Sequence, residues 1–354
     1  MLSRLVNAAV AVLSEAPGVH SRAAAWLAPC VALAACTRAP APPDAPGSAW
    51  SLGPTMPRRA LDAGVTALGV RLIVAGGYDT GASEGLDVTT RVDSFDTTTQ
   101  RWSSLPDAPV RWTEPNLASL GATLFLLGGL GGSPAAAHGE AFALDPITQR
   151  WTGIASMDAA DARGASAVLT APGRIYLLGG ASASGALATC LEYDLAADLW
   201  THLPDLPAPR AHPAAMRLVD GTLIVAGGLE SLDASAPRSE VWALAPPGSV
   251  PRVWQPRTKI PPDSDLRGGC AYGVVLGELL CAGGEGGQTA RRVVASYAPY
   301  LDQWTAREAM PVDRAGTPGV AVGGRFYVPG GAASLATEPT DTLYVYEPLD
   351  TAPR

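Results

Sequence analysis

Six arginines recur at one position in successive stretches of the sequence, and a guanidinium group repeated in this way can build an anion site. Each stands 16 to 18 residues ahead of a Gly-Gly pair. The planar guanidinium fork matches a carboxylate, but a buried guanidinium also needs a partner inside the protein. The spacing therefore predicts either a ligand-binding set or structural pairs. The six residues are Arg58, Arg111, Arg163, Arg210, Arg267 and Arg314.

Three ionisable residues follow these arginines closely and are candidates for acid–base chemistry. Asp62, Glu114 and His212 lie two to four residues after an arginine. Glu114 and His212 could transfer protons if the fold brings them into one cleft; otherwise they are ordinary loop or strand-edge residues.

The sequence contains no motif for a resident metal or cofactor. The histidines show no metal-ligand spacing, and neither a Walker motif nor a G-x-S-x-G nucleophile turn is present. We expect no metal and no cofactor.

The cysteines of the predicted propeller suggest one further covalent feature. Cys270 and Cys281 fall on the two strands of one predicted hairpin. They predict either a disulfide in an oxidising compartment or two buried free thiols, depending on strand register. Cys190 is expected to be a small core residue.

These residues are positioned by a repeated unit. Six short apolar runs end in Gly-Gly at intervals of 47 to 56 residues, and a tryptophan recurs at nearly the same interval. Two markers with a period near ~50 residues are typical of a repeat architecture. The runs suit buried strands, the glycines permit close backbone approach, and the tryptophans fill space between units. The tryptophans are Trp50, Trp102, Trp151, Trp200, Trp254 and Trp304.

The order of these markers resembles the kelch family: an apolar strand, Gly-Gly, aromatic-x-Asp, six residues and Trp. The resemblance covers residues 50–348 and implies an all-β, six-bladed kelch propeller with four antiparallel strands per blade. The last unit lacks a tryptophan of its own, so we expect the strand around Trp50 to complete it and close the ring within a domain at 49–350. Propeller symmetry would bring the six arginines to one end of the channel. In similar kelch domains, arginines at this position bind acidic groups of partners.

The first 48 residues predict export. Ala23 to Ala35 carry no charge and suit the apolar region of a signal peptide. The ending Leu33-Ala34-Ala35-Cys36 resembles a bacterial lipobox, which implies a signal at 1–35 and lipidation of Cys36. Residues 36–48, rich in proline and alanine, predict a tether. We expect a lipid-anchored protein of the bacterial envelope, periplasmic or cell-surface.

Two function classes remain open. A net charge of -8 argues against general nucleic-acid binding. Variable loops on a rigid ring favour a module that binds a protein or glycan at one face. The alternative is a periplasmic sugar mutarotase, because the chain resembles kelch-type N-acetylneuraminate epimerases in blade number, size and export. An arginine-rich channel end would suit the carboxylate of such a sugar.

Overall fold

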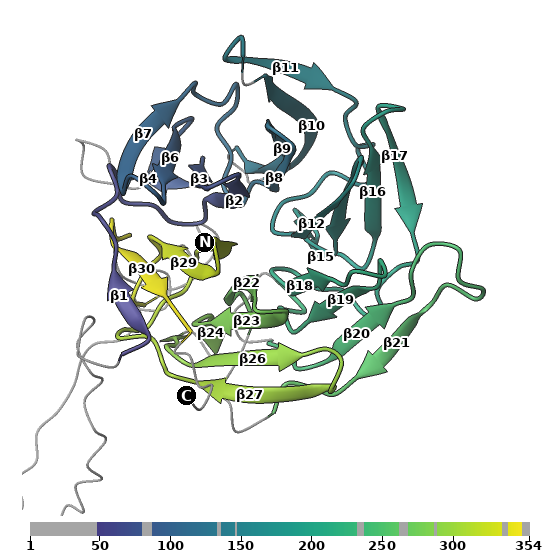
Figure 1. The fold of residues 1–354 in the computed structure, drawn as a ribbon. Coiled ribbons are helices and arrows are strands. Elements are labelled where there is room, and N and C mark those ends of the chain that lie inside the picture. Colours follow the sequence, from purple (N-terminus) through teal and green to yellow (C-terminus); the bar gives the residue numbers. More distant parts are fainter. Residues whose placement is uncertain are drawn as a thin grey trace, which may run out of the picture. The chain divides into compact units, whose positions relative to one another are not determined.

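Alternating short strands and tight turns fold into six blades arranged around a central channel (Figure 1). The computed structural model describes residues 48–79, 87–132, 136–145, 147–231, 237–261, 268–286, 289–334 and 339–348. Every regular element in these ranges is a strand, and none contains a helix long and apolar enough to cross a membrane. The predicted signal segment and Cys36 lie outside the described residues.

Each blade is a four-stranded antiparallel sheet, as predicted, and its innermost strand is the one that follows the arginine segment. Blade 1 contains β2 (Gly64–Leu68), β3 (Arg71–Ala75), β6 (Val92–Asp96) and β7 (Arg101–Leu105). Blade 2 contains β8 (Leu117–Leu120), β9 (Thr123–Gly131), β10 (Ala136–Asp145) and β11 (Arg150–Ile154). Blade 3 contains β12 (Ala167–Ala171), β13 (Arg174–Leu178), β16 (Cys190–Asp194) and β17 (Leu199–Leu203).

The second half of the ring repeats this order. Blade 4 contains β18 (Ala214–Arg217), β19 (Leu223–Ala226), β20 (Val241–Leu244) and β21 (Trp254–Arg257). Blade 5 contains β22 (Ala271–Val275), β23 (Glu278–Ala282), β26 (Val294–Ala298) and β27 (Gln303–Arg307). Blade 6 contains β28 (Val320–Val322), β29 (Arg325–Pro329), β30 (Leu343–Tyr346) and, from the other end of the domain, β1 (Trp50–Leu52).

Three two-stranded ribbons extend from the loops after the glycine pairs. They are β4 (Tyr78–Asp79) with β5 (Asp87–Val88), β14 (Ala181–Ser182) with β15 (Gly185–Ala186), and β24 (Glu285–Gly286) with β25 (Thr289–Ala290).

The apolar runs before the glycines form the second strand of each blade and are buried on both faces. In β3, Leu72, Ile73 and Val74 are fully buried. Ile73 packs toward blade 2, whereas Leu72 and Val74 pack toward blade 6. The core therefore consists of apolar layers between neighbouring blades.

The repeated tryptophans join each blade to the one before it, as predicted. Trp304 of blade 5 donates its indole N–H to the carbonyl of Thr258, 3.1 Å away just after the outer strand of blade 4. Trp50 makes the same contact with Glu308 at 3.0 Å, just after the outer strand of blade 5. Trp50 thus serves as the tryptophan of blade 6.

Strand β1 closes the ring by pairing with the last strand of the domain. Its Trp50 lies opposite Tyr346 in the antiparallel register with β30. The Trp50 side chain is 1% exposed and packs against the rings of Tyr344 and Tyr346. The predicted closure by the N-terminal strand is confirmed.

Replacing Trp50 with alanine should destabilise the whole propeller. Truncating a buried tryptophan costs roughly 3–5 kcal/mol, and here the loss falls at the closing blade. Urea unfolding followed by far-UV circular dichroism measures the change. Leu52→Ala on the same strand is the control, because Leu52 is 48% exposed and a surface change costs about 0.5 kcal/mol or less. Equal stability of the two variants would contradict this role of Trp50.

Candidate functional site

Six equivalent residues surround one end of the channel, immediately before the innermost strands. We call them the channel ring. All have a positive φ between 49° and 69°, a region that non-glycine residues adopt uncommonly. The repeat fixes this backbone shape whatever the side chain. The channel ring consists of Asp62, Glu114, Ala165, His212, Gly269 and Gly316.

The channel ring is held together by backbone hydrogen bonds from blade to blade. Glu114 N donates to Asp62 O at 2.6 Å, and Ala165 N donates to Glu114 O at 2.9 Å. The same link joins His212 to Ala165, Gly269 to His212, and Asp62 to Gly316 across the closing seam. These bonds fix the ring backbone, so each side chain has a defined place at the channel.

A second set of six residues lies beside the channel ring, each directly after a glycine pair. We call them the post-glycine positions. Each forms a β-bridge with the residue that precedes a ring residue, such as Tyr78 with Leu61 and Glu285 with Gly268. The post-glycine positions are Tyr78, Leu130, Ala181, Leu229, Glu285 and Ala332.

A cavity of about 390 Å³ occupies this end of the channel and runs along the innermost strands. Asp62, Glu114, His212 and Glu285 line it, together with the amide of Asn116. No arginine or lysine is among the lining residues that the structure describes. The cavity therefore carries a negative field, on three carboxyl groups and one imidazole.

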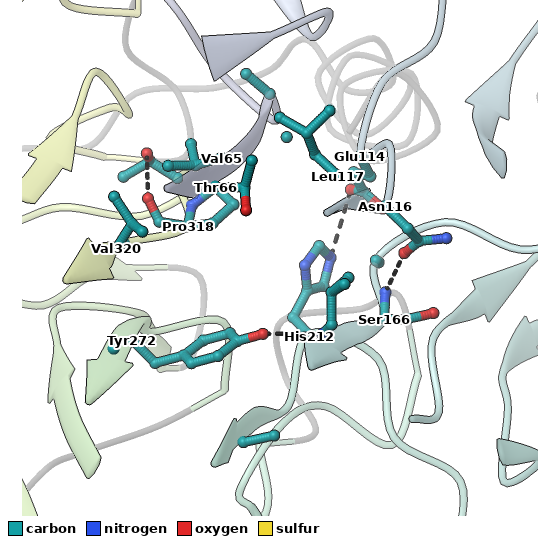
Figure 2. A pocket seen from close by; sticks show the side chains of 18 of the residues that line it. Val65, Thr66, Glu114, Asn116, Leu117, Ser166, His212, Tyr272, Pro318 and Val320 are labelled. Carbon is teal, nitrogen blue, oxygen red and sulfur yellow. Dashed lines mark hydrogen bonds and ion pairs between the residues drawn. The ribbon is translucent and has the colours of Figure 1, made fainter. Parts of the chain in front are cut away.

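Glu114 and His212 lie side by side in this cavity, as the acid–base prediction required. His212 Nε2 lies 3.4 Å from Glu114 Oε1 (Figure 2). Burial lowers the pKa of His212, but the charge of Glu114 and its hydrogen bond outweigh burial, and the net pKa is raised. The imidazole is thus favoured in its charged form beside the carboxylate.

Asp62 is a carboxyl group of the cavity with a strongly raised pKa. Burial and the neighbouring charge of Glu114 raise its pKa to about 7. Burial, with the charge of Asp62, also raises the pKa of Tyr78 to about 12. A carboxyl group of this kind exchanges its proton near neutral pH, which suits either acid–base chemistry or the binding of a cation.

The predicted arginines that the structure describes lie elsewhere, and four of the five contact their own blades. Arg58 Nε lies 2.7 Å from Asp93 Oδ2, and its Nη2 donates to Gly76 O at 2.8 Å. Arg163, fully buried, likewise donates to Gly179 O at 3.0 Å. In both blades the arginine binds the carbonyl of the first glycine of the pair, and so holds the loop that carries the post-glycine position.

The remaining arginines vary around this arrangement. Arg210 pairs with Glu240 at 2.8 Å and lies over the ring of Trp242. Arg314 lies over the ring of Tyr344. Arg111 is exposed, 3.4 Å from Asp87, and Arg267 lies outside the described residues. Contacts inside the fold are what the structural-pair alternative predicts for these arginines. They are made by Arg58, Arg163, Arg210 and Arg314.

The cysteines of the blades are free thiols in buried surroundings. Cys270 lines the cavity, and its hydrogen bond with Cys281, together with burial, raises the pKa of Cys281 well above its usual value. Of the two predicted states, the structure has the reduced one. Cys190 is fully buried, as expected of a core residue, and burial raises the pKa of its thiol to about 11.

The comparisons with known proteins agree with this architecture. No protein-family model matches the chain. Kelch-like protein terF of Aspergillus terreus is 26% identical over 295 residues, covering 79% of this chain and 63% of that protein. Kelch-like protein 36 of Bos taurus is 25% identical over 267 residues, covering 72% of this chain and 41% of that protein. The chain thus spans less than two thirds of the length of these curated relatives.

A solved structure shares the fold. The structure of YjhT superposes with a TM-score of 0.68 at 15% identity, covering 84% of this chain and 98% of that one. At this identity the likeness shows the fold alone. Together with the repeat markers and the kelch-like relatives, it defines the chain as a kelch-repeat six-bladed β-propeller.

Replacing Asp62 with asparagine should stabilise the protein at pH 8 but not at pH 4. The pKa of Asp62 is about 7 in the fold, against 3.8 for the ordinary side chain. The folded state therefore binds the extra proton, and this group lowers stability as pH rises from 4 to 7, by up to about 4 kcal/mol. Asparagine removes the charge and tolerates a positive φ.

Chemical denaturation of both proteins at pH 4 and pH 8 measures this difference. Asp198→Asn is the control, since Asp198 also has a positive φ, of 49°, but is on the outside of blade 3 and accepts from Tyr193. A stability gain from Asp62→Asn that is the same at both pH values would contradict the assigned pKa.

Proposed function

We propose that this chain is a binding module for small saccharide units, which enter the cavity at the channel ring. The observation that supports this most is the cavity itself, because carboxyl, imidazole and amide groups from several blades converge on one space of about 390 Å³. Binding pockets of proteins are concave, largely pre-formed and carry a few placed polar groups. Mostly apolar walls, including Val65 and Val320, complete this one.

The proposed ligand class follows from the lining. Carboxylate oxygens accept hydrogen bonds, and a saccharide presents several hydroxyl donors. The absence of arginine and lysine from the described lining argues against an acidic sugar, whose carboxylate would face Asp62, Glu114 and Glu285. A neutral or positively charged saccharide suits the site better.

Binding of neutral monosaccharides to the purified full-length protein tests this proposal. Saturation-transfer NMR should detect ligand protons close to the protein, and Gly269→Ala should weaken binding about tenfold or more. A Cβ at Gly269 would meet only His212 Cβ, at 3.8 Å, and Ala165 shows that alanine fits the ring backbone. Gly153→Ala, on an outer strand with open space around it, should bind as the wild type does. Equal binding by both variants would exclude the channel ring as the site.

A sugar mutarotase is the second candidate, and the Glu114–His212 pair favours it. Mutarotation needs one group to remove the proton of the anomeric hydroxyl and another to protonate the ring oxygen. Glu114 and charged His212 could serve as base and acid. Anomer exchange followed by NMR separates the candidates: binding without faster exchange of glucose or N-acetylneuraminate removes the mutarotase.

We further propose export to the bacterial envelope and lipidation of Cys36, supported by the residue pattern around Cys36. The protein partner expected at the loops beyond the glycine pairs likewise remains a proposal.

Cys36→Ser should release the chain from membranes. In cells fed an alkyne-tagged palmitate, the wild-type protein should carry the label and sediment with membranes, because its thioether-linked lipid partitions into the bilayer. Cys30→Ser, a nearby cysteine outside the lipobox-like ending, is the control. Retention of label by Cys36→Ser would contradict lipidation at Cys36.

A further inference from the structure

The cavity has one chemically distinct side. Asp62 and Glu114 of the channel ring belong to neighbouring blades, and Glu285 lies at the post-glycine position of blade 5. Between them the ring is glycine at Gly269 and Gly316. A Cβ at Gly269 would meet only His212 Cβ, at 3.8 Å, so the carboxyl groups border a space that is open at Gly269, whereas Leu61 and Asp62 occupy the space at Gly316.

The carboxyl group of Asp62 lacks a partner within the part of the chain that the structure describes. Asp62 is only 7% exposed and lines the cavity. Among the described residues, neither a hydrogen bond nor an ion pair reaches its side-chain oxygens. A buried carboxyl group without a partner is costly, whereas the buried carboxylate Asp93 is paired with Arg58. The propeller thus neutralises the buried Asp93 internally and leaves the buried Asp62 facing the cavity.

The surroundings of Asp62 would favour a cation. Among the described residues, the charged or ionisable groups around it are Glu114, Glu285, His212 and Tyr78. Glu114 and Glu285 add negative potential, and His212 is already engaged with Glu114 at 3.4 Å. Tyr78 contributes a neutral phenol. A positive group that reached Asp62 would gain an ion pair in a partly desolvated site, where such pairs are stronger than in water.

We propose that the cavity binds a protonated primary amine carried on a small saccharide, with the ammonium group at Asp62. This inference rests on the proposed saccharide-binding function and narrows it to amino sugars. An ammonium group offers three donors and no acceptor, which suits a carboxylate-lined space. The hydroxyl groups of the sugar would reach the remaining acceptors of the cavity, and the open side at Gly269 would take the ring.

A ligand series that varies only one group of glucose tests the proposal. The probes are 6-amino-6-deoxyglucose, its N-acetyl derivative, glucose and glucuronate, titrated calorimetrically into the full-length protein at pH 7.5. We expect the amine to bind at least tenfold more tightly than its N-acetyl derivative or glucose, and glucuronate to bind most weakly. (Aminomethyl)cyclohexane supplies the same amine without hydroxyl groups.

The outcomes separate this inference from the saccharide-binding function. Equal affinities across the four sugars would overturn the amine inference and leave saccharide binding intact. Binding of (aminomethyl)cyclohexane without binding of any neutral sugar would support the amine site and overturn the saccharide function. If no probe binds, both are wrong.

Asp62→Asn provides the matched variant. It should reduce the affinity for the amino sugar at least tenfold, and by a larger factor than it reduces the affinity for glucose, whereas Asp198→Asn should change neither. Lowering the pH to 5.5 should weaken amine binding to the wild type, because Asp62 then takes up a proton and His212 carries its full charge. An unchanged preference for the amine in Asp62→Asn would overturn the assignment.

Discussion

The arrangement of the propeller depends on a backbone contact between neighbouring blades at the glycine pairs. In four blades the second glycine of the pair donates its N–H to a carbonyl at the arginine segment of the next blade, as Gly180 does to Arg210 at 2.7 Å. A Cβ at Gly180 would lie 2.7 Å from the carbonyl oxygen of Gly164, so a side chain cannot be accommodated there. The same contact crosses the closing seam from Gly331 to Ala60 at 2.8 Å.

Residues with a structural role and residues of the candidate site lie only a few positions apart beside this contact. Four of the arginine side chains turn into their own blades, and two of these, Arg58 and Arg163, bind the glycine carbonyls directly. The next few residues turn through a positive φ and face the channel. Identical backbone geometry at six positions leaves the side chains free to differ. Asp62, Glu114 and His212 occupy three of them, and burial raises the pKa of Asp62.

The sequence predicted the architecture well because repeat markers report on backbone constraints that recur in every blade. Trp50 could be assigned to blade 6 because one tryptophan was missing from the last unit. The side chains of the arginines were harder to place, since a partner such as Asp93 or Glu240 comes from another strand of the sheet. The position of a residue within its repeat unit predicted which end of the channel it lies near. It did not predict the direction in which its side chain points.

Glu285 is a cavity residue that the sequence analysis did not identify, although a comparison of the repeat units would have found it. It directly follows Gly283-Gly284, where the other blades carry Tyr78, Leu130, Ala181, Leu229 and Ala332. Aligning the units on their glycines would have singled it out as an ionisable residue among mostly apolar ones. The convergence of Glu114 and His212 at 3.4 Å could not be predicted in this way, because their blades are not adjacent in the ring.

Closure by β1 also orders the events of folding in time. Trp50 is synthesised before any blade, yet its partners Tyr344 and Tyr346 come from the last strand of the domain. Such pairing brings together distant parts of the chain and is slow to form. While the chain is incomplete, β1 lacks its pairing strand, β30. The hydrogen bond from Asp62 to Gly316 spans the same seam, so the ligand site becomes complete only with the final blade.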